Sequence, residues 1–160
     1  MQNMEAVLLD PQLDANVLIG LLNGIPEFVD YAQMNQPKGL TYNLATRAEF
    51  VAGDAGTDAH LQLLEQRFGV NLIQNITKQD LDDVASRLQA AFQGDPQKRS
   101  LGEADARVAA SAFLRTEALA TADLKFFKRL RDLGLIADFI GTGRALARAA
   151  AYQPRPVTIP

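Results

Sequence analysis

The sequence predicts an α/β fold: a single domain with a mainly parallel sheet of about five strands, flanked by helices. Short apolar runs of β-forming residues alternate along the chain with stretches whose apolar residues recur at helical spacing, and this alternation is typical of parallel sheets. The chain has 160 residues, 48% hydrophobic and 22% charged, which is the composition of one globular domain with one core. Because no repeat or linker divides it, we expect residues 1–151 to form the domain and residues 152–160, which include three prolines, to form a loose tail.

Five short runs bounded by turn-forming residues are expected to form the strands. They are residues 7–9, 40–44, 70–76, 118–121 and 135–140. Of the strands in the first half of the chain, 70–76, which directly follows Gly69, is the clearest.

Helical patterns fill the segments between these runs, and several of them end at glycine or proline. They cover residues 16–22, 27–34, 46–53, 61–68, 77–92, 105–113, 126–133 and 144–151. The best marked is 77–92, in which Thr77 and Asp80 form a pair like a capping box ahead of apolar residues at three- and four-residue spacing.

The composition excludes several kinds of site. The chain has no cysteine, which rules out a disulfide framework, a thiolate zinc site and a cysteine nucleophile. No apolar run approaches the roughly 18 residues that cross a membrane, and the start lacks the basic segment of a signal peptide. We therefore expect a cytoplasmic protein without a membrane partner. Ser111 has no histidine partner in its motif, so serine hydrolysis is not expected.

Charge is distributed unevenly along the chain. The formal net charge is −3, but residues 1–80 carry 4 Lys/Arg against 10 Asp/Glu, whereas residues 81–160 carry 12 against 9. The span 125–155 is basic, with 7 Lys/Arg against 2 Asp/Glu. Because a basic stretch favours a polyanionic partner, the acidic total does not exclude nucleic acid.

Four carboxylates lie where expected strands give way to helices: Asp14, Glu49, Asp105 and Asp123. Sites of parallel sheets form beyond the carboxyl ends of the strands, so these four could meet at one edge. Taken singly, three of them are better explained as helix caps, with Asp14 and Asp123 at N-cap positions and Glu49 in a capping box with Thr46. Asp105 differs because it shares the apolar face of its helix, where a carboxylate needs a partner or a metal. Geometry alone leaves Asp80 as a further candidate for the same edge.

Four short segments around these acids carry a family resemblance. In chain order they are Asp14-Ala15-Asn16-Val17-Leu18-Ile19, Thr46-Arg47-Ala48-Glu49, Asp105-Ala106-Arg107-Val108-Ala109-Ala110-Ser111-Ala112 and Thr121-Ala122-Asp123. They resemble the signature segments of PIN-domain nucleases, the fold of VapC-type bacterial toxins, and the resemblance spans residues 6–140. It implies that the metal ligands are Asp14, Glu49, Asp105 and Asp123, that Asn16 and Thr121 are supporting polar residues, and that Glu103 is an additional acid. It also sets Asp80 aside.

Two features depart from the family's pattern. The family usually has a hydroxyl residue directly after the first aspartate, where this chain has Ala15. The first aspartate also normally follows the first strand directly, but Asp10 and three more residues separate the run 7–9 from Asp14. Either the first strand is residues 12–13 or a short insertion shifts the register. Asp10 is the rival for the first position, and we prefer Asp14 because Asn16 and an apolar run follow it.

The resemblance implies a metal-dependent endoribonuclease that is the toxin of a toxin–antitoxin pair. One or two Mg²⁺ or Mn²⁺ ions would activate water and stabilise charge on the phosphodiester oxygens, and carboxylate oxygens suit these ions without histidine or cysteine. The partners would be an RNA substrate, a protein antitoxin and a second copy in a homodimer. Two alternatives are a catalytically weak PIN-like module that binds or regulates other proteins, for which Ala15 is the hint, and a structure-specific DNA nuclease.

Basic residues near the expected site are candidates for phosphate contact. Lys125, Lys128 and Arg129 lie on the polar side of the helix that follows the Thr-x-Asp segment, and they could follow a nucleic-acid backbone. Arg47 and Arg107 are alternative contacts. For all five, the competing interpretation is an ordinary solvated helix face.

Overall fold

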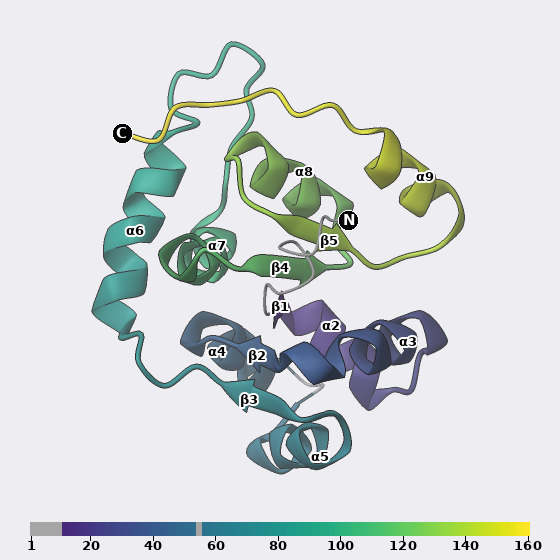
Figure 1. Cartoon of the computed structure of the whole chain (residues 1–160). Coiled ribbons are helices and arrows are strands. Elements are labelled where there is room, and N and C mark those ends of the chain that lie inside the picture. Colours follow the sequence, from purple (N-terminus) through teal and green to yellow (C-terminus); the bar gives the residue numbers. More distant parts are fainter. Residues whose placement is uncertain (1–10, 54–55) are drawn as a thin grey trace.

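The computed structural model describes residues 11–53 and 56–160, and its centre is a five-stranded parallel sheet (Figure 1). The strand order is β3-β2-β1-β4-β5, and the strands are β1 Pro11–Leu13, β2 Leu40–Tyr42, β3 Val70–Leu72, β4 Ala118–Thr121 and β5 Ala137–Phe139. Every neighbouring pair runs parallel, with Gln12 of β1 opposite Thr41 on one side and Leu119 on the other. The α/β fold with about five strands, predicted from the sequence, is confirmed.

The order of the strands creates a crevice at the centre of the sheet. From β1 the chain adds β2 and β3 on one side, and later β4 and β5 on the other. Where the direction of winding changes, between β1 and β4, the connections leave a crevice beyond the carboxyl ends of these two strands. The residues that follow Leu13 in β1 and Thr121 in β4 therefore border this crevice.

Helices cover both faces of the sheet. They are α2 Ala15–Leu22, α3 Pro26–Asn35, the 3₁₀ turn η1 Gln36–Lys38, α4 Leu44–Ala52, α5 Asp58–Phe68, α6 Lys78–Ala90, α7 Glu103–Arg115, α8 Leu124–Asp132 and α9 Gly143–Ala151. In Figure 1, α6 and α7 lie on one side of the sheet, with α2 and α3 on the opposite side. Within the described part of the chain, none of these helices is long and apolar enough to cross a membrane.

Two apolar clusters fill the space between the sheet and the helices. Neighbouring residues of β4 enter different clusters, Leu119 the one under α6 and α7, and Ala120 the one under α2 and α3. Successive side chains of a strand point to opposite faces, so a strand covered on both faces is apolar throughout. This explains why the run 118–121 shows no polar alternation.

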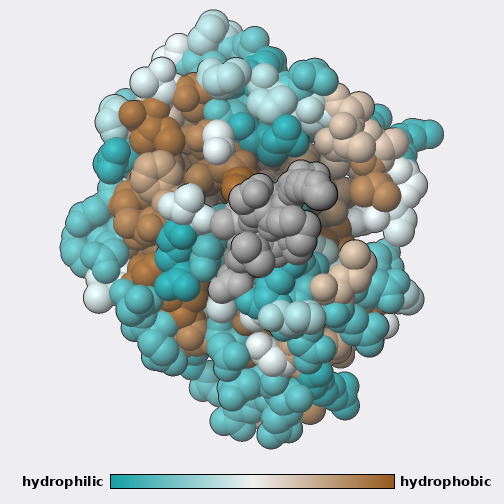
Figure 2. All heavy atoms as spheres, in the orientation of Figure 1, coloured by the Kyte–Doolittle hydropathy of each residue, from teal (hydrophilic) through white to brown (hydrophobic). Residues whose placement is uncertain are grey.

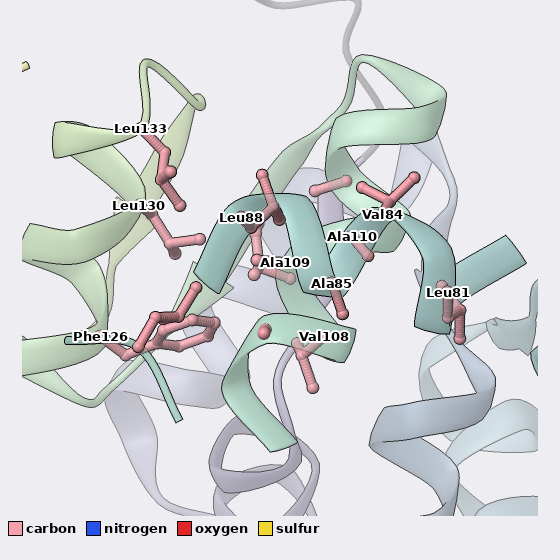
Figure 3. Packing of buried hydrophobic residues seen from close by; sticks show 14 of the residues in the cluster. Leu81, Val84, Ala85, Leu88, Val108, Ala109, Ala110, Phe126, Leu130 and Leu133 are labelled. Carbon is pink, nitrogen blue, oxygen red and sulfur yellow. The ribbon is translucent and has the colours of Figure 1, made fainter. Parts of the chain in front are cut away.

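The first cluster joins α6, α7 and α8 (Figure 3). Its members include Leu81, Val84, Ala85 and Leu88 of α6, Val108, Ala109 and Ala110 of α7, and Phe126, Leu130 and Leu133 at α8. Ala109 and Ala110 have no exposed surface, so larger side chains there would overpack the core. On the face seen in Figure 2, hydrophilic residues surround two apolar areas, a broad one beside α6 on the left and a smaller, paler one over α9 on the right, where Leu146 is exposed.

The first strand settles the register that the sequence leaves open. The alternative at residues 12–13 is confirmed, because β1 is Pro11–Leu13, while residues 7–9 and Asp10 lie outside the described residues. Asp14 follows β1 directly, and its backbone N–H donates to the carbonyl of Ala120 at 3.0 Å. No insertion therefore separates Asp14 from the strand.

Helix α4 begins two residues earlier than expected. Asn43 is its N-cap, and Oδ1 of Asn43 accepts two backbone N–H groups of the first turn at 2.9 and 3.1 Å. Thr46 is fully buried, and among the described residues its hydroxyl has no hydrogen-bond partner. The predicted capping box of Thr46 and Glu49 is therefore wrong, because Asn43 already caps the helix.

Other element ends differ little from the prediction. The capping box of Thr77 and Asp80 is present with both of its hydrogen bonds. Strand β3 is shorter than the predicted run 70–76: the N–H of Ile73 still donates to the carbonyl of Tyr42 at 2.9 Å, and the pairing stops there because β2 has ended.

The C-terminal segment is docked, so the expected loose tail is wrong. Residues 153–160 form no helix or strand, but Val157 and Ile159 pack against the cluster of α6, α7 and α8. The backbone N–H of Val157 donates to the carbonyl of Asp132 at 3.1 Å. Apolar side chains at alternate positions of this extended segment face the core, and their burial favours docking.

Replacing Asn43 with alanine should lower the free energy of unfolding by about 2 to 3 kcal/mol, because it removes a cap and a buried donor. The residue is 1% exposed, and its Nδ2 donates to Oε1 of Gln12 and to the carbonyl of Val108, each at 3.3 Å. Equilibrium unfolding in urea measures the change. The control Thr77→Ala removes an exposed N-cap and should cost about 1 kcal/mol. A loss for Asn43→Ala no larger than that of the control would contradict the prediction.

Candidate functional site

Asp14 lies buried at the crevice between β1 and β4. It is the N-cap of α2 and is 5% exposed, and its Oδ1 accepts the backbone N–H of Ala15 at 2.8 Å. Its Oδ2 accepts the hydroxyl of Thr121 at 2.8 Å and the side-chain amide of Asn16 at 3.3 Å. The carboxylate thus joins the end of β1 to the end of β4 through neutral donors.

Asn16 and Thr121 also form hydrogen bonds to the turn that follows β4, residues 122–123. Oδ1 of Asn16 accepts the N–H of Ala122 at 3.1 Å, and its Nδ2 lies 3.3 Å from Oγ1 of Thr121. Oγ1 of Thr121 also accepts the N–H of Asp123 at 3.1 Å. The two residues expected to support the site therefore hold the turn that leads to Asp123 against Asp14.

The other three acids come from three different helices. Asp123 is the exposed N-cap of α8, and its Oδ1 accepts the N–H of Phe126 at 3.2 Å. Asp105 is half-buried in the first turn of α7, and Glu49 lies on the exposed side of α4. The cap interpretation of Asp14 and Asp123 is thus correct, but a capping role does not remove either residue from the crevice.

The four carboxylates act on one another electrostatically. Burial raises the pKa of Asp14 to about 6, and nearby Glu49 and Asp123 add to the rise, against the bonds from Thr121 and Ala15. Burial likewise raises the pKa of Asp105 to about 6, with Asp14 and Asp123 adding to it and Lys125 opposing it. Partial desolvation and the charge of Asp105 raise the pKa of Glu49. Like charges that share a site disfavour one another's ionised forms, so these four residues form one electrostatic group.

The acids do not form a compact ligand cluster. Over residues 11–53 and 56–160, no three or more acidic or histidine side chains lie close enough together to hold a metal ion. Asp105 and Asp123 line a pocket of about 260 Å³, whereas Glu49 lines another of about 620 Å³. The oxygen donors suit Mg²⁺ or Mn²⁺ in kind, but bringing them onto one ion requires movement.

The basic residues predicted to contact phosphate are divided between these pockets. Lys125 and Arg129 line the pocket of Asp105 and Asp123, and Arg47 and Arg107 line the pocket of Glu49. Arg47 forms an ion pair with Asp58, and Nε of Arg107 lies 2.8 Å from Asp82.

Two residues predicted for the site lie apart from it. Nζ of Lys128 is stacked over the ring of Tyr152, 5.4 Å from its centre, and Lys128 lines neither pocket. The side chain of Glu103 is 78% exposed and lies 4.0 Å from Arg107. The structure groups neither of them with the four acids, because both point from their helices toward solvent or a neighbouring surface residue.

The buried polar residues that hold the helices of the site in place were not identified from the sequence. Asn43 connects α4, which carries Glu49, to β1 and α7 through the bonds to Gln12 and Val108. A polar residue directly after a strand is an N-cap signal that could have identified Asn43. Asp132, described below, had no such signal, because a charged residue near the end of a basic helix is typical of a solvated face.

Comparisons with known proteins show likeness in structure alone. No family sequence model matches the chain, and no curated protein matches it in sequence. A chain of VapBC2 from Rickettsia felis, in a structure with a promoter DNA fragment, matches with a TM-score of 0.65 and 15% identity, over 83% of this chain and 100% of that one. For VapBC-1 from nontypeable Haemophilus influenzae the TM-score is 0.61 with 22% identity, over 82% and 98%.

A toxin–antitoxin complex from Klebsiella pneumoniae is similar at a TM-score of 0.56 and 24% identity, over 74% of this chain and 90% of that one. At this level of identity the likeness concerns the fold. The chain therefore has the PIN-type α/β fold of the VapC-like proteins found in VapBC toxin–antitoxin complexes.

Proposed function

We propose that the chain is a metal-dependent endoribonuclease and the toxin of a toxin–antitoxin pair. The observation that carries the proposal is the buried Asp14, bound by Thr121 and Asn16 at the ends of β1 and β4, with the carboxylates of Glu49 and Asp123 acting on it. Negatively charged side chains that repel one another, two of which (Asp14 and Asp105) are partly removed from water, favour the binding of a divalent cation. The fold shared with chains of toxin–antitoxin complexes supports the same function.

The proposed roles follow from the positions of the residues. Asp14, Glu49, Asp105 and Asp123 would hold one or two Mg²⁺ or Mn²⁺ ions, which when bound supply an activated water and stabilise charge on phosphodiester oxygens. Thr121 and Asn16 orient Asp14 and the turn before Asp123. Lys125 and Arg129 attract the phosphate backbone to the pocket of Asp105 and Asp123.

The proposal extends to partners. Two of the structural neighbours are VapBC assemblies and a third is a toxin–antitoxin complex, which supports a protein antitoxin as a partner of this chain. RNA as substrate, the homodimer and the cytoplasmic location stay predictions from the sequence.

A protein-binding module without useful catalysis is the second candidate. One observation favours it: in the described residues the acids are not gathered tightly enough to bind an ion. Ala15 is a further departure from the family's pattern, although the hydroxyl of Thr121 donates to the same aspartate.

Burial of Asp105, together with the charges of the neighbouring acids, predicts an unusual dependence of stability on pH. The pKa of Asp105 is about 6 when folded, against an ordinary value of 3.8, so the fold binds this proton more tightly than the unfolded chain does. Its stabilising contribution is present below pH 3.8 and is lost as the pH rises through about 6. At pH 7.5 without divalent ions, Asp105→Asn should therefore unfold with a free energy about 1 to 2 kcal/mol above that of the wild type.

The difference should shrink toward zero near pH 4, as measured by urea unfolding at both pH values. Asp83→Asn, an exposed change on α6, is the control and should alter stability little at either pH. A gain in stability for Asp105→Asn that is no larger at pH 7.5 than at pH 4 would contradict the raised pKa of Asp105.

Labelled single-stranded RNA and DNA, incubated with Mn²⁺, Mg²⁺ or EDTA, test the activity itself. We expect cleavage of RNA that needs the ion, and a loss of at least about 100-fold in Asp14→Asn and in Asp105→Asn, the scale of losing one group that stabilises developing charge. Asp83→Asn again serves as the control and should cleave at the wild-type rate.

Three outcomes would decide against parts of this proposal. Cleavage that survives both substitutions would remove the acids from the mechanism. Cleavage of DNA alone would make the DNA nuclease correct. If no nucleic acid is cut and calorimetry detects no binding of Mn²⁺, the protein-binding module would be the better account.

A further inference from the structure

A second buried carboxylate, Asp132 at the end of α8, lies between the C-terminal segment and the proposed site. Its side chain has no exposed surface. Oδ1 accepts the hydroxyl of Tyr152 at 2.6 Å and the backbone N–H of Arg155 at 2.9 Å. Oδ2 lies 3.1 Å from Nη1 of Arg99 and 3.4 Å from Nη1 of Arg129. A carboxylate buried to this extent persists only with such a full set of partners.

The two oxygens serve different parts of the molecule. Oδ1 binds only the C-terminal segment, which Arg99 also holds through a bond of 2.6 Å to the carbonyl of Arg155. Farther along, Nε of Arg87 donates to the carbonyl of Pro160 at 2.9 Å. In Figure 1 this segment (yellow) crosses the molecule from α9 toward the end of α6. It therefore joins α9, α8 and α6 across one side of the domain.

Arg129 connects Asp132 to the proposed site. Its Nε donates to the carbonyl of Ser100 at 3.3 Å, and both residues line the pocket of Asp105 and Asp123. The bond from Arg129 to Asp132 is the longest that this carboxylate makes. The guanidinium is thus shared between Asp132 and the edge of the pocket.

We propose that Asp132 is a positioning residue for Arg129, and that the C-terminal segment acts as a strap which keeps the guanidinium at the edge of the pocket. While Tyr152 and Arg155 occupy Oδ1, only Oδ2 is available to the two arginines. When a bond to Oδ1 is lost, that oxygen becomes a better acceptor and draws Arg129 away from the pocket. The consequence for RNA rests on the proposed function, whereas the position of Arg129 does not.

The test uses the full chain with Tyr152→Phe, which removes one hydroxyl from Asp132. Tyr31→Phe is the matched control, because the hydroxyl of Tyr31 donates to Oδ2 of Asp138, also at 2.6 Å, between α3 and β5. We expect Tyr152→Phe to raise KM for single-stranded RNA about three- to tenfold with kcat changed less than twofold, and Tyr31→Phe to leave both unchanged. In an Arg129→Ala background, Tyr152→Phe should have no further effect on KM.

The same substitution should move the Nε–H NMR signal of Arg129, which is assigned by its disappearance in Arg129→Lys, whereas Tyr31→Phe should leave the signal in place. If the protein cuts no RNA, the proposed function fails, and this signal alone decides: a shift in Tyr152→Phe supports the strap, and no shift overturns it. If RNA is cut, an equal effect of both tyrosine variants, or an effect of Tyr152→Phe that persists without Arg129, would overturn it.

Discussion

The bond between the hydroxyl of Thr121 and the carboxylate of Asp14 is the contact on which the arrangement of the site depends. Asp14 follows β1 and Thr121 ends β4, so the bond of 2.8 Å links the carboxyl ends of these two neighbouring strands. The same hydroxyl accepts the N–H of Asp123, which fixes where α8 begins. The bonds do not remove the whole cost of burial, because the pKa of Asp14 is still raised to about 6.

Two buried aspartates of this domain, Asp132 and Asp14, have different kinds of hydrogen-bond and charge partners. Asp132 has two arginines beside it, together with a phenol and a backbone amide. Asp14 has neutral donors, and in the described part of the chain no ion pair forms with it. The charged side chains that affect its pKa are those of Glu49 and Asp123, which raise it. A site short of positive charge is where a cation gains the most binding energy, whereas Asp132 is fully paired and serves to hold elements together.

The elements with strong local patterns could be predicted from the sequence. Apolar periodicity located α6 and the buried strand β4, and the Thr77 capping box marked where α6 begins. The segments around Asp14 and Asp123 identified residues that the fold places at the same crevice. Asn43 and Thr46 both satisfy the composition of an N-cap, and only the position of Asn43 directly after β2 distinguishes it as the cap of α4.

Contacts between residues that are distant in the chain could not be predicted from the sequence, because they depend on how the elements pack in three dimensions. The C-terminal segment reads as a proline-containing tail, and its docking depends on Asp132 and Arg99, which no spacing connects with Tyr152 or Arg155. The distribution of the acids over two pockets likewise depends on how α4 and α7 pack against each other. The charge pattern alone predicted a single cluster, whereas the structure shows a group that is coupled electrostatically but is not gathered around one point.

Asp14 and Asp105 share one electrostatic group with Asp123, and NMR titration of their side-chain carboxyl ¹³C signals measures this coupling. Without divalent ions, both pKa values should be about 6, and both should fall in Asp123→Asn because one negative charge is removed. Titration of both carboxyls near the ordinary value of 3.8, with no response to Asp123→Asn, would contradict the account.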